Sequence, residues 1–175
     1  MLKRGCLILL TTLALAGCDD DGPTAPDDPN VVVFTAQLSA ANEVPPITNA
    51  EANARGDVRI TFNLTRDGSN NITGANVIFV VNLNSFPAGA SWTLAHIHRG
   101  ATGVAGGVVV NTGLSPANAI ALANGSVSNQ TFNPTDAISA DLANEIINNP
   151  AGFYFNVHSA LNPGGAVRGQ LVKQD

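Results

Sequence analysis

Residues 58–65 have the sequence Val58-Arg59-Ile60-Thr61-Phe62-Asn63-Leu64-Thr65, in which apolar and polar side chains alternate. Successive side chains of a strand point to opposite faces, so this stretch predicts a strand with one apolar face toward a core. Residues 67–71 then supply the residues typical of a tight turn, and residues 72–83 return with the same alternation. The two stretches therefore predict a β-hairpin.

The rest of the chain repeats this pattern of short strands separated by turns. Ser139 is a suitable N-cap for a helix over residues 140–148, and Pro150 ends that helix. Further strands are expected at residues 31–38, around the histidines at 96 and 98, at 108–110, as a short pair within 119–131, and at 153–158 and 166–172. The pattern predicts an all-β fold, an antiparallel Greek-key sandwich or barrel with one short helix.

The N-terminal segment is typical of a targeting signal. Lys3 and Arg4 precede an apolar run that is too short to span a bilayer. Residues 15–18, Leu-Ala-Gly-Cys, resemble the lipobox of bacterial lipoproteins, in which the cysteine carries the lipid after cleavage. The alternative is an ordinary secretory signal. We expect a signal peptide at 1–17, a flexible acidic tether at 18–30, a folded domain at 31–175, and anchoring at Cys18 on the periplasmic or cell-surface side of a bacterial membrane.

Charge and cysteine content narrow the classes of function. The chain has 8 basic and 13 acidic residues and a net charge of -5, without a basic stripe, which argues against a nucleic-acid partner. Cleavage would remove Cys6, and lipidation would use Cys18, so the folded part would have no disulfide. Its stability must therefore come from the core.

The three histidines of the chain are the candidate metal ligands. His96 and His98 are two residues apart in a strand-like stretch, so they share one face. His158 ends a second such stretch and supplies a third imidazole if the two strands lie side by side. Three neutral imidazoles suit copper or zinc. The alternative is a polar cluster that only holds strands together, and the sequence marks no fourth ligand.

Five blocks of the sequence resemble the CHRD domain, the repeated module of chordin that also occurs alone in bacterial exported proteins. These blocks are residues 34–39, 42–46, 96–100, 156–159 and 162–171, and the resemblance covers about 32–171. Ser159 stands where the family usually has threonine, and Ala166 where an acidic residue is common. The resemblance implies an extracytoplasmic, mostly β domain. It implies no settled biochemical function, and the growth factors bound by chordin are not expected partners here.

Glu43 and Arg168 are the charged residues inside these blocks apart from Arg99. Buried charges are almost always paired, so we expect a partly buried ion pair that locks the first and last strands. The alternative is that the two residues form a ligand-binding pair.

The sequence contains no recognisable catalytic set. The glycine-rich loop at 100–107 lacks the Gly-Lys-Ser/Thr of a phosphate-binding loop. Three histidines are too few for the two metals of a copper/zinc superoxide dismutase. The leading hypothesis is a non-enzymatic, lipid-anchored module that binds an unknown envelope or extracellular ligand. The alternatives are a copper- or zinc-binding envelope protein with a redox or metal-handling role, and a purely structural envelope protein.

Overall fold

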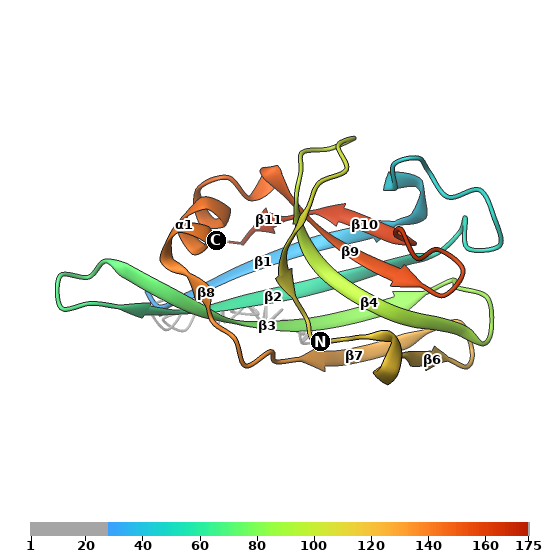
Figure 1. The fold of residues 1–175 in the computed structure, drawn as a ribbon, viewed down its shortest axis with the longest axis horizontal. Coiled ribbons are helices and arrows are strands. Elements are labelled where there is room, and N and C mark those ends of the chain that lie inside the picture. The colour runs from blue at the N-terminus through green and yellow to red at the C-terminus, as the bar shows by residue number, and fades with distance from the viewer. Residues whose placement is uncertain (1–27, 175) are drawn as a thin grey trace, which may run out of the picture.

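The computed structural model describes residues 28–174, which form eleven strands, one α-helix and three short 3₁₀ turns (Figure 1). The predicted signal peptide, Cys18 and most of the predicted tether lie outside the described residues. Within residues 28–174, no helix is long and apolar enough to cross a membrane.

The elements follow one another with short connections. The strands are β1 (Val31–Ser39), β2 (Arg55–Arg66), β3 (Ile72–Asn84), β4 (Ala90–Arg99), β5 (Val108–Asn111), β6 (Ile120–Leu122), β7 (Val127–Phe132), β8 (Ile138–Ser139), β9 (Phe153–Ser159), β10 (Val167–Gln170) and β11 (Val172–Lys173). The helix α1 spans Ala140–Asn148, and the 3₁₀ turns lie at Ala40–Asn42, Pro116–Asn118 and Pro150–Gly152.

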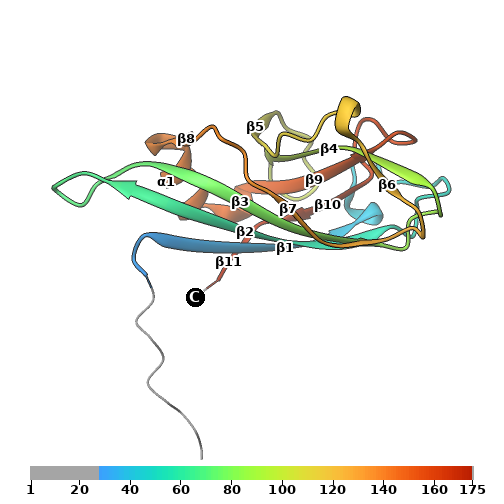
Figure 2. The same cartoon turned by 90° about the horizontal axis from the view of Figure 1, so that it is seen from below.

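All strand pairs are antiparallel and belong to one curled sheet. Its main path runs β5-β4-β9-β10-β1-β2-β3-β7, with β6 beside β4, β8 beside β3 and β11 beside β1. The sheet curls so that β4, β9 and β10 lie over β1, β2 and β3, which makes a half-barrel of two layers (Figure 2). The all-β, antiparallel fold with one short helix is therefore confirmed.

The predicted hairpin forms the floor of this half-barrel. Val58, Ile60 and Phe62 of β2 are almost completely buried, and β3 pairs with β2 over its whole length. The Phe79 ring of β3 lies 5.6 Å from the Phe155 ring of β9, measured between centroids, so the core lies between the two layers. Alternation in the sequence thus identified the inward face correctly.

The bounds of the helix agree with the sequence prediction, whereas those of the last strand do not. The Ser139 side chain accepts a hydrogen bond from the Leu142 N–H, as expected for an N-cap, and α1 has the predicted bounds. The last strand was predicted as one element, but it is divided into β10 and β11 at the buried Leu171. The Leu171 N–H still bonds to the Phe153 carbonyl, beyond the pairing of β10 with β9, whereas β11 after it pairs with β1.

Candidate functional site

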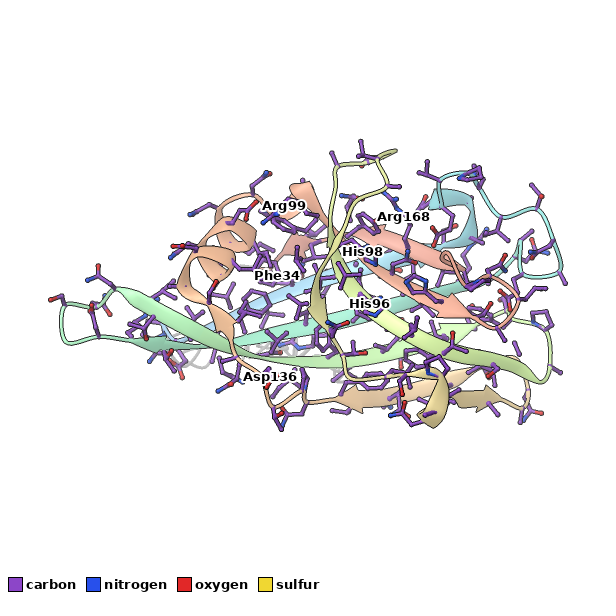
Figure 3. The ribbon with its side chains drawn as sticks, in the orientation of Figure 1. Phe34, His96, His98, Arg99, Asp136 and Arg168 are labelled. Atoms are coloured by element: carbon purple, nitrogen blue, oxygen red, sulfur yellow. The ribbon has the colours of Figure 1, made fainter. Side chains whose placement is uncertain are left out.

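Strands β4 and β9 bring the three histidines together. In the antiparallel register His96 lies opposite Asn156, His98 opposite Tyr154 and Leu94 opposite His158. His96, His98 and His158 point away from the core, to the face that the loops cover, and all three are buried. Figure 3 labels His96 and His98, which lie close together on β4. The adjacency that the sequence left open is therefore present.

The three imidazoles converge on one point. The His96 Nδ1 atom lies 3.3 Å from the His158 Nε2 atom, and one nitrogen from each of the three rings lies within 4.8 Å of the others. Zinc–nitrogen bonds of about 2.0–2.1 Å separate tetrahedral ligand atoms by roughly 3.3 Å. The His96–His158 pair already has that spacing.

Backbone carbonyls orient two of the rings. The His98 Nδ1 atom donates to the Gly106 carbonyl and the His158 Nδ1 atom donates to the Pro163 carbonyl, both at 2.9 Å. With the proton on Nδ1, the neutral ring keeps its lone pair on Nε2. The His98 Nε2 atom is buried and has no hydrogen-bond partner among the described residues. Metal-binding histidines are commonly held in this way by their second nitrogen.

The surroundings keep the imidazoles neutral. Burial lowers the pKa of His96 to about 4, and the neighbouring His158 and His98 add to the effect. Burial also lowers the pKa of His98 and of His158, although the hydrogen bonds to Gly106 and Pro163 oppose it. Neutral imidazole is the form that binds a metal ion.

A stack of side chains backs the histidine cluster. The His98 and Tyr154 rings are nearly parallel, with centroids 4.9 Å apart, and the Arg168 guanidinium lies 3.7 Å from the Tyr154 ring centre on β9. The Tyr154 hydroxyl accepts a hydrogen bond from the Gly106 N–H at 3.1 Å. Sequence reasoning missed this role of Tyr154, although its alternation with His158 already places both on one face.

A buried carboxylate fixes the loop that orients His158. Glu51 is 1% exposed, and its Oε2 atom accepts hydrogen bonds from the Ser159 hydroxyl and the Asn162 side-chain amide, each at 2.6 Å. This loop carries the Pro163 carbonyl that receives the His158 N–H. Glu51 lies in a turn without periodicity, so no sequence signal identified it.

Glu43 and Arg168 are neighbours without a direct ion pair. Burial raises the pKa of Glu43 to about 7, and the Arg168 guanidinium opposes this rise. Within residues 28–174 the ion pair formed at 4.0 Å or less is instead Arg99–Glu145, on the surface. Strands β1 and β10 pair directly at Ser39 and Arg168, and the Asn42 side chain adds a hydrogen bond to the Arg168 carbonyl at 3.0 Å.

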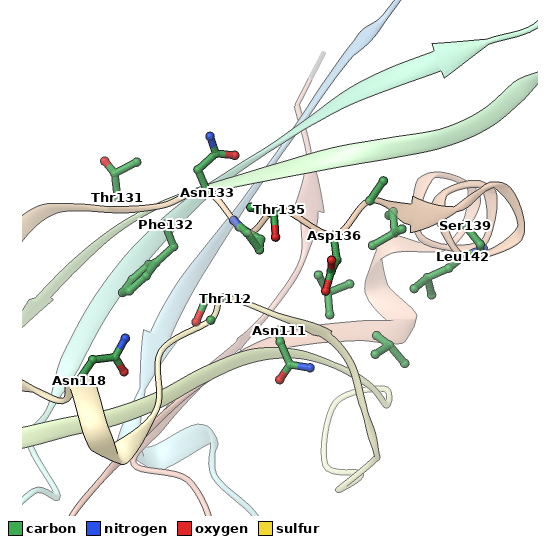
Figure 4. Close-up of a pocket in the computed structure, with 16 residues that line it drawn as sticks. Asn111, Thr112, Asn118, Thr131, Phe132, Asn133, Thr135, Asp136, Ser139 and Leu142 are labelled. Atoms are coloured by element: carbon green, nitrogen blue, oxygen red, sulfur yellow. The ribbon is translucent and has the colours of Figure 1, made fainter.

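The largest described cavity lies away from the histidines. It has a volume of about 720 Å³ and lies between β5 with its following turn and the segment from Thr131 to Leu142 (Figure 4). Its lining mixes polar residues such as Asn111, Asn133 and Asp136 with apolar residues such as Phe132 and Leu142, and it includes none of the predicted site residues. Cavity size therefore does not identify the candidate site in this protein.

The fold and the histidine positions define an antiparallel β domain with a buried cluster of three imidazoles on strands β4 and β9. The family profile described as CHRD domain matches residues 34–171, and the chain belongs to this family. No curated protein matched the sequence. No solved structure matched it either.

Proposed function

We propose that this CHRD domain binds one transition-metal ion, copper or zinc, through His96, His98 and His158. The supporting observation is the buried His98 Nε2 atom, which lacks a hydrogen-bond partner among the described residues. The centroid of its ring lies 5.6 Å from that of His96 and 5.9 Å from that of His158. A buried polar atom without a partner costs about 1–3 kcal/mol, and a metal ion would satisfy it.

Three imidazoles leave a coordination position open on the ion. The cluster contains no fourth histidine, cysteine or carboxylate from the described part of the chain. A water molecule or an external ligand would complete the sphere, as at zinc sites with three protein ligands. Imidazole suits both zinc and copper, so the donor set favours a metal-handling role for either ion.

Elemental analysis of protein purified without a histidine tag tests this proposal. We expect one metal ion per chain after incubation with copper or zinc and removal of the excess, and loss of that ion in His96→Ala and His158→Ala. Asn82→Ala is the matched control, because Asn82 donates to Asp57 on β2 and accepts from the Asn129 N–H, far from the histidine strands. Folded wild-type protein that retains no metal under these conditions would refute the proposal.

We also propose that the domain is exported and lipid-anchored through Cys18, as a non-enzymatic module with an envelope or extracellular ligand. The signal-like residues 1–17, the cysteine at 18 and the Asp- and Pro-rich residues 19–30 support this. Mass spectrometry of the mature N-terminus should find a lipid-modified Cys18, and Cys18→Ala should move the protein from the membrane to the soluble fraction. An unmodified cysteine in membrane-bound protein would contradict it.

A further inference from the structure

A second cavity lies beside Arg168, the residue that stacks on Tyr154, and apart from the histidines. It has a volume of about 590 Å³ and is lined by residues 41–44 and Pro46, by the loop residues Thr102 and Gly103, and by Arg168, Gly169 and Gln170 of β10. This volume is within the range of roughly 300–1,000 Å³ that is typical of small-molecule sites. None of the three histidines lines it.

Arg168 supplies the positive charge of this cavity. The residue is 2% exposed, and the central carbon of its guanidinium lies over the Tyr154 ring, 3.7 Å from the ring centre. Its hydrogen bond within the described residues is a single one, from Nη2 to the Ala101 carbonyl at 3.3 Å. The other guanidinium N–H groups have no acceptor in residues 28–174, and no carboxylate oxygen there lies within 4.0 Å. Glu43 is an electrostatic neighbour of Arg168 and balances its charge only when the carboxyl group is ionised. The guanidinium therefore keeps N–H groups that can donate to the negatively charged group of a ligand.

The Glu43 carboxyl group, the second charged group of the cavity, also lacks a hydrogen-bond partner within residues 28–174 for one of its oxygens. Glu43 is 7% exposed, and its Oε1 atom is buried without a hydrogen-bond partner in the described chain. Burial raises the pKa of Glu43 to about 7, so a large share of the carboxyl is protonated near neutral pH and able to donate. The cavity also has an apolar wall, formed by Ala41, Val44 and Pro46, and Val44 is 42% exposed.

We propose that this cavity binds a small aliphatic monocarboxylate, with its carboxylate on the Arg168 guanidinium and the Glu43 side chain, and its hydrocarbon part against Val44 and Pro46. The planar guanidinium matches a carboxylate through two parallel N–H···O bonds. A protonated Glu43 donates to the same carboxylate, which satisfies both unpartnered groups. One guanidinium balances one negative charge, whereas a phosphate dianion would add a second charge facing the oxygens of Glu43.

Ligand-observed saturation-transfer NMR with butyrate tests the proposal on the full chain after chelator treatment. We expect saturable binding with a dissociation constant on the order of 1 mM, which is reasonable for a ligand of this size. Val44→Glu places a negative charge at the exposed rim and should weaken butyrate binding at least roughly tenfold. Val172→Glu is the matched control, because Val172 is 58% exposed on β11 and does not line the cavity. It should bind butyrate like the wild type.

Three outcomes would overturn the proposal. These are no saturable signal at concentrations roughly tenfold above the expected constant, equal binding by Val44→Glu, and methyl phosphate binding as tightly as butyrate. Arg168→Lys keeps the charge but loses the two parallel bonds, so it should weaken butyrate binding while circular dichroism confirms the fold. Because all measurements use metal-free protein, their failure would leave the metal proposal untouched, and the converse also holds.

Discussion

Acidification of the metal-free protein should reveal how strongly the fold opposes protonation of His96. The pKa of this imidazole is 6.5 in its ordinary state and about 4 in the folded protein, chiefly because of burial. Between these pH values the unfolded chain binds more protons at His96 than the folded one. The stabilising contribution is therefore complete above pH 6.5 and is lost as the pH falls toward 4.

The size of the effect follows from the two pKa values. At pH 4.5 the linkage relation gives a loss of about 2.5 kcal/mol in the free energy of unfolding attributable to His96, which is a large share of the stability of an average domain. Glu43 acts in the opposite direction, because its pKa is raised to about 7. The wild-type curve alone therefore underestimates the histidine contribution, and a variant must isolate it.

Urea unfolding at pH 7 and pH 4.5, in wild type and His96→Gln, provides that comparison. Trp92 is the chain's single tryptophan and is 1% exposed, so its fluorescence should report the transition. The variant keeps a polar side chain but cannot titrate, and it should lose about 2.5 kcal/mol less than the wild type on acidification. If the two proteins change by the same amount, within about 0.5 kcal/mol, then burial does not control this imidazole and the reasoning fails.

Three further predictions concern stability. Glu43 has a raised pKa, so its carboxyl group stabilises the folded protein at low pH and loses that contribution as the pH rises through 7. Between pH 4.5 and 8 this lowers the free energy of unfolding of the wild type by up to about 3 kcal/mol, and Glu43→Gln should remove the decrease. Urea unfolding across this pH range measures the difference. Gly169→Ala should destabilise by at least about 2 kcal/mol, since its Cβ would lie 2.1 Å from the Gln37 carbonyl oxygen, and an unchanged Tm would contradict this. Phe79→Ala should cost about 3–5 kcal/mol through the cavity it leaves in the core, measured by urea unfolding, and a cost below about 1 kcal/mol would mean that the layers pack differently.

The sequence predicted the elements well, because their signals are local. Strict alternation in residues 58–65 sets which side chains face the core, and Ser139 with Pro150 sets the limits of α1. The division of the last strand at Leu171 has no such signal. It depends on which strand the backbone pairs with, β9 for β10 and β1 for β11, and this pairing is set by the arrangement of the whole sheet.

The candidate site was predictable in part for the same reason. Alternation places His96 and His98 on one face, but whether β9 lies beside β4 depends on pairing between segments about sixty residues apart. The carbonyls that orient the rings, and Glu51 beneath the Pro163 loop, belong to turns without periodicity. Composition and spacing carry no information on such contacts.

The histidine cluster and the core use opposite faces of the same strand. On β9, Phe155 and Val157 face the core, whereas Tyr154, Asn156 and His158 face the covering loops. A metal ion would join β4 and β9, which the sheet already pairs, so its stabilisation would follow from mass action, about 2.7 kcal/mol at a hundredfold excess over the dissociation constant. Because the strands already pair in the sheet, we expect the domain to fold without a metal ion and the histidine variants to remain folded while losing the ion.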